Sequence, residues 1–280
     1  MSKVKVLIPT DFSMQSEFAG IMARRLGSWL DLELHFIHII HLPNHVTIDP
    51  QGEIHADGEY DPRDFIRMRE MIQKRLDKLK EEFSNIHTHI GYGGMKETVV
   101  KFAHEHHFDL ILMGTKGSYG LKEKLTGSET QHVVRRSMVP VLSVMCDRSD
   151  LNIENVLLVH DFAAEEDQDL KILKLLLKAT GARLHLLYVS KKDNDVFVDQ
   201  MRKNMEAFRN SFGYENTEIH VIQDHNVVHG ITHFNQMRDM DMVCIGTHGR
   251  KGIQQLFYSS PVEKLVNHLY KPLITYHLES

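Results

Sequence analysis

The feature that most constrains the fold of this chain is an internal repeat. The segment VLIPTDFS at residues 6–13 recurs as VLLVHDFA at residues 156–163, an offset of 150. Toward the other end of each half, LILMGTKG at residues 110–117 recurs as MVCIGTHG at residues 242–249, an offset of 132. Because both the beginnings and the ends match, the 280 residues are predicted to form two similar domains, each large enough to bury its own core.

The two offsets differ by 18 residues, which the second half must lack between the two blocks. At the corresponding place the first half carries residues 43–62, a polar stretch with Gly52 and Gly58 and no hydrophobic period. A compact domain normally keeps so long an excursion for a lid or an interaction surface, so we expect a mobile loop there. The polar connection CDRSDLNIE separates the halves and sets the predicted domains at residues 1–147 and 153–280.

Strands and helices alternate along each half. Residues 4–9 form an apolar run that stops at a loop, as a buried parallel strand does, and Ser13 then offers a helix N-cap. The repeated order β-α-β-α-β-α-β-α-β predicts an α/β fold of two tandem five-stranded parallel-sheet sandwiches. In such sheets ligands bind outside the carboxyl ends of the strands, where the strand order reverses. The loops at that position are Pro9-Thr10-Asp11 and the loop that begins at Gly114.

The loop after the fourth strand has the composition of an anion-binding site. Gly114 and Gly117 are followed, after nine residues, by Gly127 and Ser128 at the start of a helix. Glycines let backbone N–H groups approach phosphate oxygens, Ser128 adds a hydroxyl donor, and a helix start presents unpaired N–H groups. The alternative is an ordinary tight turn between a strand and a helix, in which the glycines serve only the backbone.

This glycine spacing, the opening strand that ends near Asp11 and the repeated five-strand half together resemble the universal stress protein family, specifically tandem-domain members of its ATP-binding branch. The resemblance covers almost the whole chain apart from residues 43–62. It implies a Rossmann-like fold of the adenine nucleotide α-hydrolase-like type, with ATP and Mg²⁺ in the first domain and hydrolysis slow or absent. The nucleotide contacts that it implies are Pro9, Thr10, Asp11, Ile39, Met113, Gly114, Gly117, Gly127 and Ser128.

The second half departs from this pattern. Gly246 and Gly249 are kept, but Ser259, Ser260 and Pro261 stand where the first half has Gly-Ser-Glu. A side chain at the glycine position blocks the close approach of backbone to phosphate, and proline removes an N–H donor. We therefore expect this half to bind nucleotide weakly or not at all, with a smaller anion as the alternative.

The last strand of each half, residues 139–145 and 271–277, would lie at the edge of a sheet. Exposed edges promote aggregation, and pairing the two edges within one chain removes that hazard. In the family that the chain resembles this strand forms the dimer contact, which implies an internal pseudo-dimer of the two halves. Monomer and homodimer of the whole chain are both left as alternatives.

Charge and cysteine content exclude several classes of protein. Lysine and arginine total 33 against 38 acidic residues, and the net charge of −5 predicts no binding to nucleic acid or to an anionic membrane. No apolar run reaches the roughly 18 residues of a membrane span, and no export pattern opens the chain. Cys146 and Cys244 are too few for a disulfide framework and too isolated for a CxxC pair, so we expect a cytoplasmic protein.

The 20 histidines raise the question of metal binding. His225, His229 and His233 are spaced four apart and would share one face of a helix, although one face cannot complete a tetrahedral site by itself. A solvated histidine face is the alternative. A second group at the strand ends of the second half consists of His160, Asp161 and His248.

The sequence contains no local signature of a nucleophile beside a base, such as GxSxG or HExxH, so we expect no enzyme beyond a slow ATPase. The hypothesis is a cytosolic stress-response protein whose first domain binds ATP and which acts as a nucleotide-dependent regulator or sensor of a protein partner. The alternatives are a non-nucleotide scaffold, a small-ligand or metal-binding sensor on the same fold, or a slow ATPase.

Overall fold

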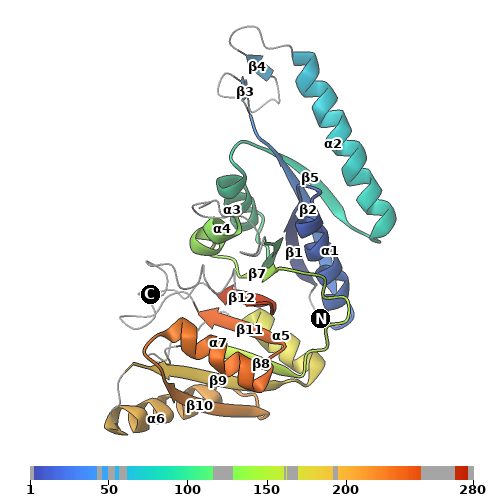
Figure 1. Cartoon of the computed structure of the whole chain (residues 1–280). Coiled ribbons are helices and arrows are strands. Elements are labelled where there is room, and N and C mark those ends of the chain that lie inside the picture. The colour runs from blue at the N-terminus through green and yellow to red at the C-terminus, as the bar shows by residue number, and fades with distance from the viewer. Residues whose placement is uncertain are drawn as a thin grey trace.

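The computed structural model shows strands and helices alternating in both halves of the chain (Figure 1). It describes residues 3–42, 46–49, 54–56, 62–115, 129–160, 162, 170–191, 195–246 and 269–276. The elements of the first half are β1 (Val4–Pro9), α1 (Met14–Leu26), β2 (Leu32–Ile40), β3 (Val46–Ile48), β4 (Ile54–Ala56), α2 (Pro62–Glu82), β5 (His87–Tyr92), α3 (Met95–Glu105), β6 (Leu110–Gly114), α4 (Glu129–Arg136) and β7 (Val141–Val144). Those of the second half are β8 (Asn155–Val159), α5 (Lys171–Thr180), β9 (Arg183–Ser190), α6 (Asp195–Phe212), β10 (Thr217–Gln223), α7 (Val227–Arg238), β11 (Met242–Gly246) and β12 (Leu273–Tyr276).

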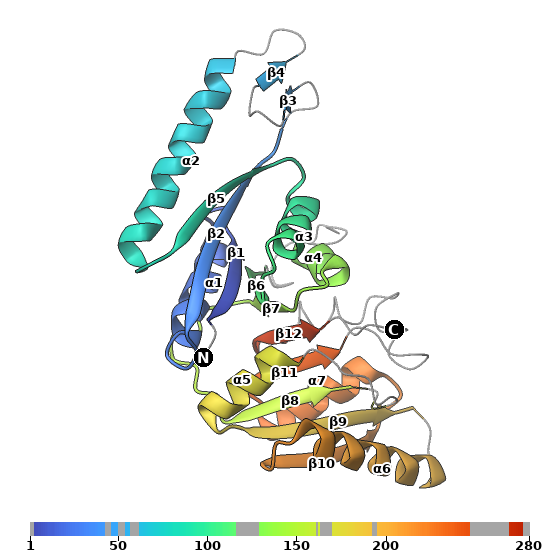
Figure 2. The same ribbon diagram turned by 180° about the vertical axis from the view of Figure 1, so that it is seen from behind.

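Ten of the described strands join into one sheet in the order β10-β9-β8-β11-β12-β7-β6-β1-β2-β5. Within each half the strands of this sheet are parallel, and the two halves meet where β12 pairs with β7 in the antiparallel sense. Ile274 lies opposite Leu142 in this pairing. The α/β fold and the internal pairing of the two last strands are thus confirmed. Figure 2 shows the two halves on either side of β7 and β12.

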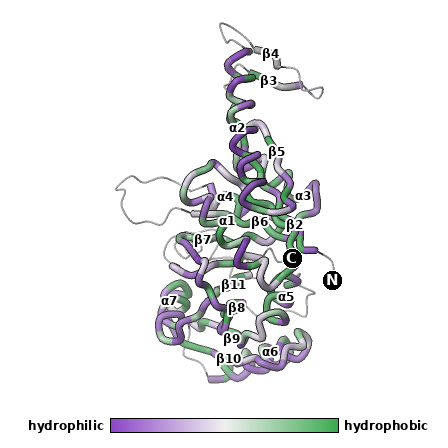
Figure 3. The backbone as a smooth tube through the Cα atoms, turned by 90° about the vertical axis from the view of Figure 1, so that its right-hand side faces the viewer, coloured by the Kyte–Doolittle hydropathy of each residue, from purple (hydrophilic) through white to green (hydrophobic). Residues whose placement is uncertain are grey.

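Alternation along the strands builds a core on both faces of the sheet. In β1, Val6 and Ile8 pack with Met22 of α1 on one face, while Leu7 packs with Val99 of α3 on the other. All of these side chains are fully buried. Both core clusters contain residues of both halves, so the core continues across the junction of β7 and β12. Figure 3 shows hydrophobic colour along the central strands and hydrophilic colour over much of α2.

Residues 43–62, predicted to be a loop, contain a short antiparallel hairpin made of β3 and β4. The prediction was wrong for these six residues. Val46, Thr47 and Ile48 are β-branched and favour extended backbone, but three residues are too short to give a recognisable alternation in the sequence. The ring of His55 lies 3.0 Å from the Asp49 carboxylate, between Nε2 and Oδ2, at the end of β3. Asp49 follows β3 and Pro62 begins α2, while residues 43–45, 50–53 and 57–61 lie outside the described part of the chain.

Helix α2 leads from the hairpin back to the sheet. It packs against the sheet through a few side chains on one face. Phe65, Ile72 and Leu76 are buried, whereas most side chains between them are exposed. The ring of Phe65 lies 5.8 Å from that of Tyr92 at the end of β5. In Figure 1 the helix runs beside β5 and reaches β3 and β4 beyond the main sheet. Among the helices that the structure describes, none combines the length and apolar composition needed to cross a bilayer.

Candidate functional site

The strand order of the first half reverses between β1 and β6, and this reversal places the two predicted loops side by side. Leu7 and Ile111 are in register, so Pro9 and Met113 stand at the same level near the ends of their strands. Thr10 follows β1 directly, and Gly114 ends β6. Of the other predicted contacts, Gly117, Gly127 and Ser128 lie outside the described residues.

Thr10 organises the loop after β1. Its backbone N–H donates to the carbonyl oxygen of Ile37 at 2.8 Å, which extends the β1–β2 ladder by one residue. Its buried hydroxyl oxygen Oγ1 accepts from the N–H of Phe12 at 3.1 Å and also lies 3.1 Å from Oγ of Ser16. Phe12 has a φ of 60°, a left-handed conformation that the Thr10 hydrogen bond stabilises. The hydrogen bonds of Thr10 therefore fix the conformation of the loop after β1.

Asp11 is exposed at the tip of the same loop. Its Oδ1 accepts from the N–H of Ser13 at 3.0 Å, and Ser13 in turn caps α1 by accepting from the N–H of Ser16. Partial burial raises the pKa of the Asp11 carboxyl, but hydrogen bonds from Ser13 and Ser16 outweigh it and hold the pKa below its ordinary value. The side chain is thus an ionised acceptor at neutral pH, suited to bind hydroxyl groups or a cation.

Gly114 lies against the first turn of α1. A Cβ atom added to Gly114 would stand 1.8 Å from the carbonyl oxygen of Gln15, so only glycine fits there. The carbonyl oxygen of Gly114 accepts from Oγ1 of Thr130 at 3.2 Å, which fastens α4 to the end of β6. Gly114 therefore has a packing role that is independent of any phosphate.

Thr115 follows Gly114 directly after β6 and was not among the predicted site residues. Thr115 is 2 % exposed, and its buried hydroxyl oxygen Oγ1 has no hydrogen-bond partner among the described residues. Its backbone N–H donates to the carbonyl oxygen of Val144 at 2.8 Å. A buried hydroxyl without a partner is costly, and it is a polar group that a ligand can satisfy. Its position between Gly114 and Gly117 is the sequence signal that could have identified it.

The predicted apolar contacts lie on the face of the sheet that α3 and α4 cover. Met113 is 3 % exposed and belongs to the core cluster that contains Ile37, while Ile39 is partly buried against that cluster. Pro9 is also buried. The structure brings these three residues to the carboxyl ends of adjacent strands, with Ile39 the most accessible of them.

Three side chains that sequence reasoning missed support the β1 loop from the other face. His38 of β2 donates from Nδ1 to the carbonyl oxygen of Thr10 at 2.7 Å. The Phe12 ring stacks on His38 with a centroid distance of 5.0 Å, and the Arg75 guanidinium of α2 lies 4.3 Å from the Phe12 centroid. This stack links the loop to α2. No local sequence motif predicts this stack, because the three residues lie on separate elements.

The second half reproduces the same loop with a different side chain. His160 occupies the position of Thr10 at the repeat offset of 150, and its Nδ1 accepts from the N–H of Phe162 at 2.8 Å. Phe162 has a φ of 51°, close to that of Phe12. The His160 ring is buried against Phe162 and Phe208. Its predicted companions Asp161 and His248, like Ser259, Ser260 and Pro261, lie outside the described residues.

Of the predicted metal-binding histidines, His225 and His229 approach each other and Asp224. The Asp224 carboxylate lies 3.0 Å from Nδ1 of His225 and 2.6 Å from Nδ1 of His229. The ring of His233 lies 6.1 Å from that of His229, one turn further along α7. Two other clusters were not predicted, namely Glu33 with His35 and His87, and His185 with Glu218 and His220.

The two cysteines are unpaired, as expected. Cys244 is fully buried in β11, and burial raises the pKa of its thiol far above the ordinary value. A thiol in that state is a packing group with little nucleophilic character.

The fold defines a class of protein: two parallel-sheet α/β domains that share one sheet, with the strand order of the first domain reversing between β1 and β6. Comparison with known proteins identifies that class further. The sequence model of the universal stress protein family matches residues 4–144 and again residues 152–277. The chain belongs to the universal stress protein family, with two family domains in tandem.

Relatives of this chain support that assignment. Universal stress protein MJ0531 of Methanocaldococcus jannaschii is 32 % identical over 144 residues, which are 50 % of this chain and 81 % of that protein. Universal stress protein MJ0577 of the same organism is 27 % identical over 154 residues, 50 % of this chain and 93 % of that protein. The crystal structure of a universal stress protein from Archaeoglobus fulgidus superposes with a TM-score of 0.73 at 20 % identity, covering 99 % of this chain and 97 % of that chain.

Proposed function

We propose that the first domain, residues 1–147, binds ATP with Mg²⁺ and that the protein acts as a cytoplasmic, nucleotide-dependent regulator. The observation that carries this proposal is the placement of the Asp11 loop beside the end of β6. Because β1 and β6 are neighbours in register, an ionised carboxylate and the start of the glycine loop lie at the same edge of the sheet. That combination suits a ligand with hydroxyl groups at one end and phosphates at the other.

Different residues of the first domain contact different parts of the nucleotide. Asp11 accepts hydrogen bonds from the ribose hydroxyls, and Pro9, Thr10 and Ile39 border the adenine. Gly114, Gly117, Gly127 and Ser128 supply the phosphate-binding loop that the glycine spacing predicts, and Met113 lies beneath it. The unpartnered hydroxyl of Thr115 fits this proposal because it is a buried donor directly after Gly114.

Mg²⁺ fits the same residues. When bound, the ion neutralises charge on the phosphates. In this chain Asp11 is the ionised carboxylate at this edge of the sheet, and while it binds the ribose hydroxyls it would hold the ion through water. The chain's own contribution is to bind and orient the nucleotide, and we propose no fast hydrolysis.

The second domain, residues 153–280, is proposed to bind nucleotide weakly or not at all. Its first loop keeps the left-handed turn at Phe162, so the scaffold of the site is retained. Ser259 and Pro261 replace the glycine and a backbone donor of the first domain. Its role in this proposal is to complete the shared sheet.

The regulatory step follows from the stack of Arg75, Phe12 and His38. Phe12 directly follows Asp11, and Arg75 belongs to α2, which leads to the hairpin of β3 and β4. A nucleotide that orders the Asp11 loop would therefore change the stability of α2. We propose that α2 and the hairpin form the surface to which a protein partner binds.

Substitution of Asp11 tests the site. Asp11→Ala is expected to weaken binding of magnesium-ATP at least ten-fold, measured by calorimetric titration, because a charge-assisted acceptor is lost. Asp147→Ala is a matched control, since Asp147 makes the same kind of turn by accepting from the N–H of Ser149 at 2.8 Å. Equal affinities in the two variants would contradict the assignment. Gly127→Ser, which introduces the side chain found at position 259, is expected to abolish binding while the fold persists.

A further inference from the structure

A pair of histidines on neighbouring strands recurs in both domains, away from the nucleotide crevice. In the first domain Nδ1 of His35 in β2 lies 2.9 Å from Nε2 of His89 in β5. In the second domain Nδ1 of His185 in β9 lies 3.0 Å from Nε2 of His220 in β10. His35 and His185 are separated by the repeat offset of 150, so the two pairs are equivalent. The structure has therefore kept this contact in both copies of the domain.

The residues two positions before each histidine lie on the same face of the sheet, because side chains alternate along a strand. In the first domain these are Glu33 before His35 and His87 before His89. His35 and His87 are in register on adjacent strands, while Glu33 precedes and His89 follows that level, so four side chains with metal-binding atoms form a staggered row on one face. Glu33 lies toward the amino ends of the strands, whereas the nucleotide crevice lies beyond their carboxyl ends.

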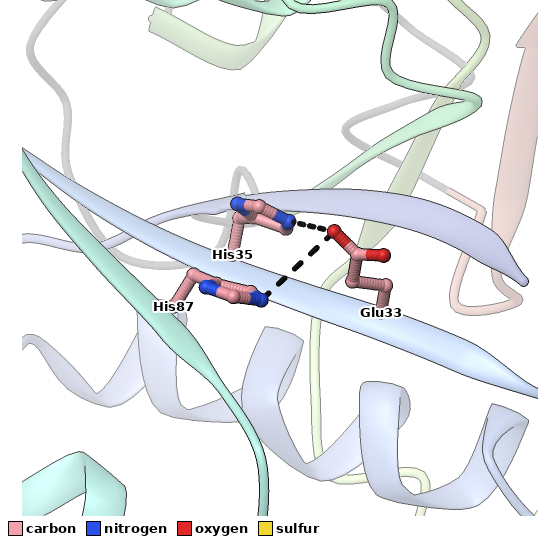
Figure 4. Close-up of side chains that lie close together, drawn as sticks. All are labelled: Glu33, His35 and His87. Carbon is pink, nitrogen blue, oxygen red and sulfur yellow. Dashed lines mark hydrogen bonds and ion pairs between the residues drawn. The ribbon is translucent and has the colours of Figure 1, made fainter.

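The donor atoms of three of these side chains converge (Figure 4). Oε1 of Glu33 lies 2.7 Å from Nε2 of His35 and 3.9 Å from Nε2 of His87, and the three atoms lie within 4.8 Å of one another. Ligand atoms around a tetrahedral zinc ion stand about 3.3 Å apart, given bond lengths of about 2.0–2.1 Å. Both Glu33 distances differ from that spacing by about 0.6 Å, and the two histidine nitrogens must close by up to about 1.5 Å. The His87 side chain is 57 % exposed and that of Glu33 is 37 % exposed, so both can make this adjustment.

His35 is the fixed member of the group. Its side chain is only 9 % exposed, and its second ring nitrogen contacts His89. Histidines that ligate metals use the other ring nitrogen in just such a hydrogen bond, which orients the ring. The Phe108 ring, packed edge-on at a centroid distance of 4.9 Å, also restrains His35. Lys5 of β1 lies opposite Glu33 in register, and its Nζ donates to the carbonyl oxygen of His106 at 2.8 Å.

The second domain has different side chains at two of these four positions. Arg183 stands at the position of Glu33, and Glu218 stands at the position of His87. Nη1 of Arg183 lies 3.0 Å from Oε1 of Glu218, so the protein supplies its own cation beside this carboxylate. Nε2 of His185 lies 3.2 Å from Oδ1 of Asn155, which takes the place of the glutamate contact of His35. The guanidinium already neutralises the carboxylate that a metal ion would need.

We propose that Glu33, His35 and His87 form a binding site for one divalent cation of the zinc class, with His89 as a positioning residue. Two imidazoles and one carboxylate are a donor set that zinc prefers, and the fourth position is left to water. The ion replaces the proton that His35 Nε2 donates to Glu33. His35 then carries its proton on Nδ1 and donates it to Nε2 of His89, whose own proton resides on Nδ1. Each imidazole stays neutral, and no net proton is released.

The cluster of Asp224, His225 and His229 is the competing candidate within the described residues. His225 and His229 are exposed, with side chains 81 % and 61 % accessible, and both place Nδ1 on the same carboxylate. Neither is buried as His35 is. We therefore expect this cluster to bind metal more weakly than Glu33, His35 and His87 do.

Competition titration of Zn²⁺ against a chromophoric chelator, on the chelator-stripped full chain, tests the site. The wild type is expected to bind one Zn²⁺ per chain at micromolar or lower concentration. Glu33→Gln and His87→Gln are each expected to weaken binding at least ten-fold, since each removes one ligand from an exposed side chain and leaves the fold intact. Glu218→Gln in the second domain and the double variant His225→Gln/His229→Gln are matched controls, and both are expected to keep the single tight site.

A transplant experiment tests the same proposal by gain of binding. The double variant Arg183→Glu/Glu218→His gives the second domain the residues of the first, and it is expected to bind two Zn²⁺ per chain. Glu33→Arg is expected to bind none tightly while its melting temperature without metal stays near that of the wild type. Wild-type binding only at millimolar Zn²⁺, unchanged affinity in Glu33→Gln and His87→Gln, or loss of the tight site in the His225/His229 variant would each overturn the proposal.

Discussion

Nδ1 of His185 and Nε2 of His220 lie 3.0 Å apart in the second domain, and the two rings cannot both be protonated without breaking this contact. Only one hydrogen can occupy the space between two ring nitrogens, so at least one imidazole of the pair must stay neutral. Burial, together with the charges of His185, Arg238 and Arg202, lowers the pKa of His220 to about 4, although Glu218 opposes the shift.

Stability is therefore expected to fall on acidification. Above pH 6.5 His220 is neutral in the folded and unfolded chains and has no effect. Between pH 6.5 and about 4 the unfolded chain binds a proton that the folded chain does not, so the free energy of unfolding decreases. Melting temperatures measured from pH 7.5 to 4.5 check this. His220→Gln, whose amide can still donate to His185, should flatten the profile, and a profile as steep as that of His225→Gln would contradict the account.

Gly114→Ala is expected to destabilise the protein by more than about 3 kcal/mol, because the new Cβ meets backbone at 1.8 Å and no side-chain rotation relieves it. Gly181→Ala is the matched control. Gly181 has a φ of 70° but open space around it, so alanine there should cost only about 1–2 kcal/mol of backbone strain. Urea unfolding curves of the two variants make the comparison. Similar free energies of unfolding would show that the end of β6 can move away from α1.

The junction of β7 and β12 is expected to make the two halves unfold together. Trp29, the single tryptophan, lies in the first half, while Ile274 is fully buried in the second and lies opposite Leu142. Ile274→Ala should lower the free energy of unfolding by about 2–5 kcal/mol. Trp29 fluorescence and far-ultraviolet circular dichroism should report the same shifted midpoint. A fluorescence midpoint that stays at the wild-type value would show that the halves unfold independently.

The stack of Arg75 on Phe12 is expected to couple the crevice to α2. Magnesium-ATP should slow amide hydrogen exchange in α2 of the wild type, because a more ordered Asp11 loop holds Arg75 in place. Arg75→Ala should remove most of this protection while changing ATP affinity less than three-fold. Arg67→Ala, which removes an exposed ion pair with Asp64 on the same helix, is the control. Protection that persists in Arg75→Ala would mean that the nucleotide acts on α2 by another route.

Much of the fold could be predicted from the sequence because each element carries its own periodicity. The offset of 150 between Val6 and Val156 and the alternation of strands and helices predicted two similar α/β halves, and the edge argument predicted the pairing of β7 with β12. The hairpin of β3 and β4 was missed because three-residue strands are too short to show a pattern. Its stability comes from pairing between segments, which sequence periodicity does not record.

The candidate site was predictable in part for the same reason. Thr10 and Asp11 were found because they follow a strong strand signal, and the structure shows that Thr10 shapes the loop while Asp11 is exposed. The packing role of Gly114 depends on α1, which lies about a hundred residues away in the sequence. The repeated histidine pairs did leave a signal, the ELH and RLH segments at residues 33–35 and 183–185, but their partners differ between the halves.

The measurement that tests the central claim most directly is a calorimetric titration of the nucleotide-stripped full chain with magnesium-ATP, run on the wild type and on Asp11→Ala. The account predicts about one ATP per wild-type chain and at least ten-fold weaker binding in the variant, with a rise in melting temperature only for the wild type at equal ATP. Two ATP per chain would contradict the assignment of the second domain. No heat and no thermal shift up to millimolar ATP would contradict nucleotide binding itself and favour the scaffold alternative.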